Sequence, residues 1–427
     1  MNRSFKSLLA AAFASLLAPA AVQAQLPSTL TDGVQEMDTS LFANVFNLPA
    51  DDPVDASIVG DMTGATLNQF NVDVGGFLSS SNEPFFFTEV NILSGGDTAS
   101  SIDFTNAEIN ILSGGELGSS ANLNSGATLN ASSGSTIGTN LDLRGNAILN
   151  FSGGTLGANV IAFDADTTIN ISGGSINSVD SSGIVNITGG NFIAAPDFLT
   201  GSVVSVSDAT FGNNADFNGT TTIDSGTFGT NTNAGVGSTL TINDATIEGF
   251  DAQDGSNVTI NGGDLGISFD AESGSIVVIN DGTFGSTFNP NEGSDVTING
   301  GEFGQFFTNE GTTTISGGTF DDQFFSPGDI WFLGSDFAVN GIAIDGDSFD
   351  AVEGSLLTGI LQDGSTIEFD LFSVSDDLIP ITDRPDFFGG VLSVNDTTIN
   401  IVGVPEPSSL SLLALGALGL IARRKRS

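Results

Sequence analysis

The stretch Ile169-Asn170-Ile171-Ser172-Gly173-Gly174-Ser175-Ile176 contains the pattern that decides the fold. Apolar and polar residues alternate over its first four positions, two glycines follow, and an apolar residue closes it. Alternation with period two is typical of a β-strand with one buried face, and glycine tolerates the backbone of a sharp corner. The stretch therefore predicts one strand, a corner and the start of a second strand.

The same unit recurs along the chain with a mean spacing of about 18.5 residues. Leu78 and Thr98 extend the series toward the N-terminus, for 14 units in all. The closing apolar residues of the other units are Leu117, Ile137, Leu156, Ile176, Phe192, Phe211, Phe228, Ile247, Leu265, Phe284, Phe303 and Phe320. The unit is too short for a propeller blade, and it lacks the 3.6-residue apolar period of a helix. We therefore expect an all-β fold, a parallel β-helix (β-solenoid) of about 14 coils over residues 55–326.

Fixed positions within the ten most regular units predict which side chains are buried. The residue five before the closing position is apolar in all ten units, and the residue six before it is polar in nine, Val278 being the exception. The first position is expected to form a buried ladder, and the second to face outward. Glycine stands two before the closing residue in eight units. Asp208, Asp244 and Asp281 stand at the same corner, where we expect a left-handed backbone.

Beyond the repeats the sequence changes character. An Asn340-Gly341 turn and an Asp363-Gly364 turn, each between alternating runs, are strong hairpin signals. We therefore expect a small antiparallel β cap over residues 327–403, with a last strand in 391–402. Residues 25–54 have little periodicity and are expected to form an N-terminal lead-in or cap.

The first 24 residues have the three parts of a secretory signal peptide. Arg3 and Lys6 give a positive start, residues 8–17 are apolar, and Val22-Gln23-Ala24 is a small-residue cleavage site. We expect this segment, residues 1–24, to direct export and to be removed.

The last 24 residues, 404–427, combine a short motif, an apolar segment and a basic end. The motif is Val404, Pro405, Glu406 and Pro407. The apolar segment, residues 410–422, is shorter than the roughly 17 to 25 residues of a membrane-spanning helix. The basic stop is Arg423, Arg424, Lys425 and Arg426.

This tail closely resembles the PEP-CTERM sorting signal of Gram-negative bacteria. The resemblance implies export, transient contact of the tail with the inner membrane, and cleavage near the motif by an exosortase-type membrane protease. It implies delivery to the cell surface or extracellular matrix, where an exopolysaccharide is a further candidate partner. It covers only the tail, so it leaves the activity of residues 25–403 open.

Charge excludes several partners for that central part. The chain has 51 acidic and eight Lys or Arg side chains, for a formal net charge of −43. Because six bases and one acid lie in the two terminal segments, residues 25–403 have 50 acids against Arg144 and Arg384, a net charge of −48. Such a surface repels nucleic acid and polyanionic glycans. The 34 Phe residues and 39% apolar content still supply a core.

The residue types present also limit the chemistry. The chain contains no His, Tyr or Cys, which removes most general bases, Ser-His-Asp and Cys-His nucleophiles, and disulfides. Three acidic pairs keep open a carbohydrate-active β-helix enzyme that uses carboxylates, although such pairs are also typical of solvated turns. They are Asp164-x-Asp166, Asp321-Asp322 and Asp345-Gly346-Asp347.

Two binding functions also stay open. Carboxylates favour loosely bound calcium, but the glycine-rich nonapeptide of calcium-roll solenoids is absent. Aligned threonines could order water as ice-binding proteins do, but Thr is also an ordinary outward strand residue. They are Thr220-x-Thr222, Thr239-x-Thr241 and Thr312-x-Thr314. We expect a non-enzymatic, exported structural or adhesive protein without a cofactor; the alternatives are the carboxylate enzyme and a calcium- or ice-binding module.

Overall fold

The computed structural model describes residues 94–98, 100–304, 306–320, 323–326, 328–344, 348–350, 355–372, 390–393 and 398–403, with short strands between residues 35 and 92. These residues form strands and turns, and no helix is found among them. The chain divides into two compact units, residues 1–229 (unit 1) and 230–427 (unit 2). Together they contain about 12 turns of a parallel β-solenoid, which confirms the predicted fold class.

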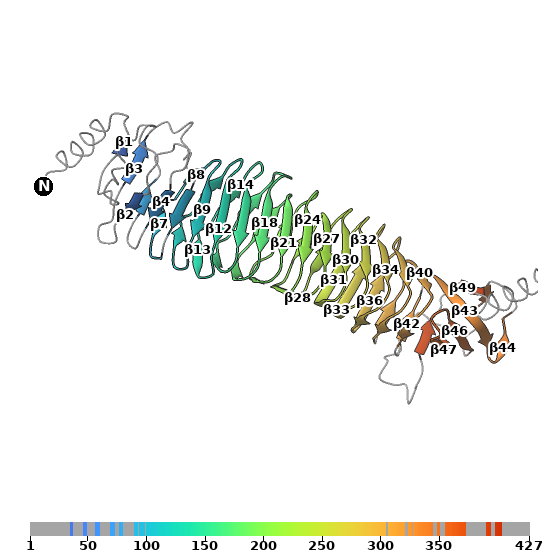
Figure 1. Ribbon diagram of the computed structural model, residues 1–427. Helices are drawn as coiled ribbons and strands as arrows, with labels where there is room; N and C mark the ends of the chain where they lie inside the picture. The colour runs from blue at the N-terminus through green and yellow to red at the C-terminus, as the bar shows by residue number, and fades with distance from the viewer. Residues whose placement is uncertain are drawn as a thin grey trace, which may run out of the picture. The chain divides into compact units, whose positions relative to one another are not determined.

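Each coil of unit 1 has three short strands, and like strands of successive coils pair in parallel (Figure 1). The first series is β9 (Glu108–Ile111), β12 (Thr128–Ala131), β15 (Ile148–Phe151), β18 (Thr168–Ile171), β21 (Ile184–Ile187), β24 (Val203–Val206) and β27 (Thr220–Ile223). The second is β10 (Glu116–Leu117), β13 (Ser135–Ile137), β16 (Gly154–Leu156), β19 (Ser175–Ile176), β22 (Asn191–Phe192), β25 (Ala209–Phe211) and β28 (Gly226–Phe228). The third is β8 (Asp103–Phe104), β11 (Asn122–Leu123), β14 (Asp142–Leu143), β17 (Val160–Ala162), β20 (Val179–Ser181), β23 (Asp197–Phe198) and β26 (Asp216–Phe217).

Parallel pairing begins before the first regular repeat. β2, which lies within residues 25–54 expected to be a lead-in, pairs in parallel with β4, and β4 pairs with β6, which continues the first series. The early strands are β1 (Gln35–Glu36), β2 (Phe46–Leu48), β3 (Ala56–Val59), β4 (Gln69–Val72), β5 (Phe77–Ser79), β6 (Glu89–Ile92) and β7 (Asp97–Thr98).

The predicted alternation is confirmed in the first series. All ten ladder residues are at most 1% exposed, because within each unit in-register parallel pairing stacks the residue of one coil on its counterpart in the next. They are Phe151, Ile171, Ile187, Val206, Ile223, Ile242, Ile260, Ile279, Ile298 and Ile315. The residues just before them face outward and are half-buried or exposed.

The corner glycines adopt the left-handed backbone that the sequence predicts. All eight have positive φ angles; at Gly154, where φ is 95°, an added Cβ would lie 2.0 Å from the carbonyl oxygen of Ser135. Asp208, at φ 52°, conforms to the prediction, but Asp244 and Asp281 do not. Gly282 takes the positive φ in place of Asp281, whose carboxylate accepts a hydrogen bond from the Gly282 amide at 2.8 Å. The corner at Asp244 turns with neither Asp244 nor Ala245 in that region.

Unit 2 repeats the coil with one change. In β31 (Thr246–Ala252) and β33 (Asp264–Ala271) the second and third strands run together, and their register shifts between Ile247 and Gly249. Both units have stacked phenylalanines in the core, with ring centroids 4.4 Å apart for Phe192–Phe211 in unit 1 and 4.7 Å apart for Phe284–Phe303 in unit 2. The other strands are β29 (Thr232–Ala234), β30 (Thr239–Ile242), β32 (Asn257–Ile260), β34 (Ile276–Ile279), β35 (Thr283–Phe284), β36 (Thr287–Pro290), β37 (Asp295–Ile298), β38 (Glu302–Phe303), β39 (Phe306–Thr308), β40 (Thr312–Ile315), β41 (Thr319–Phe320) and β42 (Gln323–Phe325).

The C-terminal strands contain both predicted hairpins. β43 (Asp329–Val339) begins in parallel with β40 and then turns at Asn340-Gly341 into β44 (Ile342–Ala343), while β46 (Leu356–Leu361) and β47 (Thr366–Phe372) pair antiparallel. β45 (Ser348–Asp350) is antiparallel to β49 (Thr398–Gly403).

The prediction of a single last strand over residues 391–402 is wrong. Two strands, β48 (Gly390–Ser393) and β49, occupy that range and pair in parallel with β42 and β43. The sequence between them holds Asn395 and Asp396, which favour turns.

Candidate functional site

A column of asparagine side chains runs along the outward face of the first series in unit 1. The Nδ2 group of each donates a hydrogen bond to the Oδ1 atom of the one before it, over 2.7 to 3.0 Å. Ser205 extends the column by donating from its hydroxyl to Asn186 Oδ1 at 3.1 Å. We call this column the amide ladder; its asparagines are Asn91, Asn110, Asn130, Asn150, Asn170 and Asn186.

The ladder follows from the strand pattern and the register. Asn150 is the third residue of β15, between Leu149 and Phe151, which are both buried, so its side chain must point outward. Parallel strands lie about 4.8 Å apart, a distance that lets an amide reach its counterpart in the next coil. Because both partners are held by the backbone, each amide keeps a fixed orientation.

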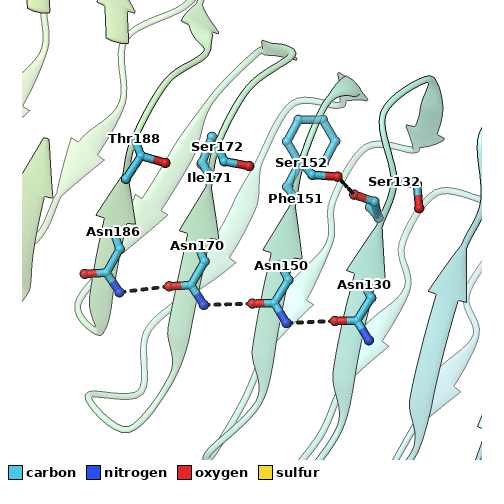
Figure 2. Close-up of a pocket in the computed structure, with 11 residues that line it drawn as sticks. Asn130, Ser132, Asn150, Phe151, Ser152, Asn170, Ile171, Ser172, Asn186 and Thr188 are labelled. Atoms are coloured by element: carbon cyan, nitrogen blue, oxygen red, sulfur yellow. Dashed lines mark hydrogen bonds between the residues drawn. The ribbon is translucent and has the colours of Figure 1, made fainter. Parts of the chain in front are cut away.

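An open hollow of about 300 Å³ lies beside the ladder. Its polar lining comes from the asparagines of β12, β15, β18 and β21 and from a row of hydroxyl residues just past these strands. Figure 2 shows the two rows side by side, with the ladder hydrogen bonds running from coil to coil. The hydroxyl residues are Ser132, Ser152, Ser172 and Thr188. The hollow therefore offers amides and hydroxyls, and no charged group lines it.

Unit 2 has a second ladder at a different position. Asn261, Asn280 and Asn299 each donate from Nδ2 to the Oδ1 atom of the preceding asparagine, beginning with Asn243, at 2.8 to 2.9 Å. These residues stand one position after the buried isoleucine of each strand, at the corner, where their hydrogen bonds are exposed to solvent.

Acidic side chains gather on the third series instead. In unit 1, Asp180 pairs in register with Asp197, and burial together with the Asp197 charge raises the pKa of Asp180. In unit 2, burial, the charge of Asp270 and that of Glu272 raise the pKa of Asp251 to about 6. Within the described residues, no group of three or more His, Cys, Asp or Glu side chains is arranged to hold a metal ion. Loosely bound calcium stays a prediction.

Of the acidic pairs and arginines singled out in the sequence between residues 25 and 403, the structure describes Asp164, Asp166 and Arg144, which lie on neighbouring turns. Asp164 and Asp166 lie exposed on one turn, and the Asp164 carboxylate accepts a hydrogen bond from the Gly145 amide at 2.5 Å. Arg144 forms an ion pair with Asp142 of β14. The pairs at 321–322 and 345–347, and Arg384, lie outside the described residues. The structure therefore brings none of the described candidates together into a catalytic pair.

The threonine pairs do lie on the outward face, on β27, β30 and β40. The pair on β27 belongs to unit 1, and the pairs on β30 and β40 belong to unit 2. Asn257 and Asp295 take the place of the first threonine in two of the strands between β30 and β40. The second threonine of each pair stands at the strand position that the amide ladder uses in unit 1. The sequence alone did not predict this ladder. The pattern that could have predicted it is an Asn directly after Ile or Leu at the same position of successive repeats, as at Asn110, Asn130 and Asn150.

The sorting residues, Val404 to Pro407 and Arg423 to Arg426, lie outside the described residues. Residues 403–426 match the family model of the PEP-CTERM protein-sorting motif. This match shows the sorting signal predicted from the tail, and the signal implies an exported protein of Gram-negative-type bacteria that is processed by an exosortase, a membrane protein.

No curated protein and no solved structure matches the chain. Among the residues that the structure describes, no helix has the length and apolar character needed to cross a membrane.

Proposed function

We propose that the protein is a non-enzymatic structural or adhesive element of the bacterial cell surface or extracellular matrix. The observation that carries this proposal is the pairing of a PEP-CTERM tail with a β-solenoid whose outward faces are regular, repetitive arrays. A solenoid gives an extended series of equivalent surface positions, which suits contact with a polymer or a surface better than with a small substrate.

The residue inventory supports a role without catalysis. The chain has no His, Tyr or Cys, so a hydrolytic site would have to be built from carboxylates. Asp164 and Asp166, the described acidic pair, are exposed on a turn rather than set in a cleft. A carboxylate enzyme stays the alternative. Turnover of a polysaccharide that is abolished by Asp164→Asn, Asp321→Asn or Asp322→Asn would favour that alternative.

Tail processing provides the direct test of the delivery route. The mature protein, isolated from the cell surface or medium, should lack Arg423 to Arg426 when its C-terminus is determined by mass spectrometry. Glu406→Ala should leave unprocessed precursor in the inner membrane, whereas the matched control Glu368→Ala, on an exposed strand position of unit 2, should be processed normally. Surface-delivered protein with an intact basic end would contradict the exosortase route.

A further inference from the structure

The outward face of the first series in unit 1 is free of charge over six successive coils, β12 to β27. Two columns of residues form it, and in-register pairing fixes both. The first column is Thr128, Ile148, Thr168, Ile184, Val203 and Thr220. The second is Asn130, Asn150, Asn170, Asn186, Ser205 and Thr222. We call these two columns the neutral face.

The outward positions of the second series, from Thr136 of β13 to Thr227 of β28, are uncharged as well, whereas the third side of the same coils is acidic. On the third series of the same unit, outward positions carry Asp142, Asp180, Asp197 and Asp216. Acidic residues are thus segregated to another side of the coil, and the neutral face is left able to approach an uncharged surface without desolvating a carboxylate.

The neutral face also offers a fixed pattern of hydrogen-bonding groups. Each ladder amide uses one N–H and one oxygen lone pair along the ladder, so Asn150 and Asn170 keep one N–H and one lone pair for a ligand. The hydroxyl row of the hollow lies beside them. Since the ladder already orders these amides, little side-chain entropy is lost when a ligand binds.

The first column adds apolar contact area beside the amides. Ile184 and Val203, neighbours in adjacent coils, are 42% and 54% exposed. Amides and hydroxyls next to exposed aliphatic groups match the chemistry of a sugar ring, which presents hydroxyls at its edge and C–H groups on its faces. An anionic sugar would be repelled by the net charge of the chain.

From these observations we infer that the neutral face binds an uncharged polysaccharide, whose chain lies along the coil stack. Six coils at about 4.8 Å spacing give a track of roughly 24 Å, long enough for several sugar units. Each unit meets an uncharged polar side chain of the second column, an Asn in four coils and Ser205 or Thr222 in the other two. Several weak contacts on one polymer add up through their high effective concentration. The inference rests on the proposed surface role, and it names the class of partner for it.

Binding of the purified full chain to microcrystalline cellulose, soluble mixed-linkage β-glucan and dextran tests the inference, with polygalacturonate as the anionic comparison. Affinity electrophoresis and pull-down measure retention. We expect at least one neutral polymer to be retained and polygalacturonate not to be. Because the test uses purified protein in solution, its result is independent of tail processing.

Ile184→Asp with Val203→Asp should weaken retention at least tenfold, since both place a carboxylate on exposed positions of the face. The matched control is Ile276→Asp, which changes a 49% exposed isoleucine of the same column in unit 2 and should leave retention within twofold. Thr168→Glu serves as the second variant if the double variant melts at a lower temperature than the parent.

Three results would overturn the inference. The first is no retention on any neutral polymer, and the second is an equal loss for Ile276→Asp. The third is a different occupant of the face: concentration-dependent dimers in sedimentation that the double variant abolishes would assign it to a second copy of the chain, and thermal hysteresis lost in the same variant would assign it to ice.

Discussion

Units 1 and 2 are built from the same coil, yet their amide ladders occupy different places. In unit 1 the ladder uses the third residue of each first-series strand, between two buried side chains. In unit 2 that position holds Thr241, Thr259 and Val278, and the ladder lies two residues further on, at the corner. In-register stacking thus turns an asparagine repeated at either position into a ladder, and the position decides whether its hydrogen bonds are partly buried or exposed to solvent.

The outward faces also differ in charge. The first column of unit 2 contains Asp295 and Asp329, at positions equivalent to those that carry Ile, Val or Thr in β12 to β27 of unit 1. In unit 1 the acids of this column, Glu89 and Glu108, stand only in the earlier strands β6 and β9. The second-series core changes from aliphatic to aromatic within each unit. Leu117, Ile137 and Leu156 precede Phe192 in unit 1, and Ile247 and Leu265 precede Phe284 in unit 2. Both units then pack two columns of phenylalanine edge to face, with ring centroids 6.2 Å apart for Phe211 and Phe217 and 5.3 Å apart for Phe284 and Phe288. One backbone plan therefore accommodates different interiors and different surfaces.

The largest expected effect concerns the inward–outward division that both units share. Ile260 of unit 2 is fully buried in the ladder, so Ile260→Asp places a carboxylate between stacked apolar side chains and should lower the free energy of unfolding by about 3 to 5 kcal/mol. Thr259→Asp, one residue earlier and facing outward, should cost less than about 1 kcal/mol. Urea unfolding measures both, and equal losses would break the alternation.

The corners of unit 1 provide the next test. Gly154→Ala combines a φ of 95° with a Cβ 2.0 Å from a backbone oxygen, and it should cost about 3 kcal/mol or more. Gly201 has nearly the same φ, 94°, but an added Cβ there meets nothing within 4 Å, so Gly201→Ala should cost only about 1 to 2 kcal/mol. Thermal unfolding of the two variants separates backbone strain from coil-to-coil contact.

A third pair of variants sharpens the comparison of the two ladders. Asn150→Ala and Asn280→Ala each remove two coil-to-coil amide hydrogen bonds. The ladder of unit 1 is partly buried, so Asn150→Ala should destabilise by about 1 to 3 kcal/mol, and Asn280→Ala by less than about 1 kcal/mol. An equal loss in urea unfolding would mean that the position of a ladder does not affect its strength.

The smallest effect is a pH dependence from the acidic column of unit 2. The pKa of Asp251 is raised to about 6 in the folded protein, whereas its ordinary pKa is 3.8. Between these two pH values the folded state therefore holds a proton that the unfolded state has released. This contribution to stability is present below the lower value and is lost as pH rises to about 6. Asp251→Asn should flatten the change in melting temperature between pH 4 and 6. An unchanged slope in the variant would assign it to other groups.

Local patterns in the sequence determined the coil itself. Period-two alternation places Ile260 inside and Thr259 outside because successive side chains of a strand point to opposite faces. The corner glycines follow from the positive φ of a sharp turn, which a residue without a Cβ tolerates best. The Asn340-Gly341 and Asp363-Gly364 hairpins are equally local signals. The sorting motif is a linear sequence and needs no fold to be recognised.

Only the tertiary structure decided which residues became neighbours between coils. Asn150 and Asn170 are 20 residues apart and Asn170 and Asn186 only 16, yet both pairs make the same hydrogen bond. Backbone pairing and the buried ladder hold the strands in register, so the shorter coil loses its four residues at two corners. Five residues, 163–167, separate β17 from β18, whereas two, 182–183, separate β20 from β21. Three residues, 157–159, separate β16 from β17, whereas two, 177–178, separate β19 from β20. The amide ladder, the neutral face and the acidic columns all depend on that register. A pattern read within one repeat does not contain it, because the register is set by contacts between repeats.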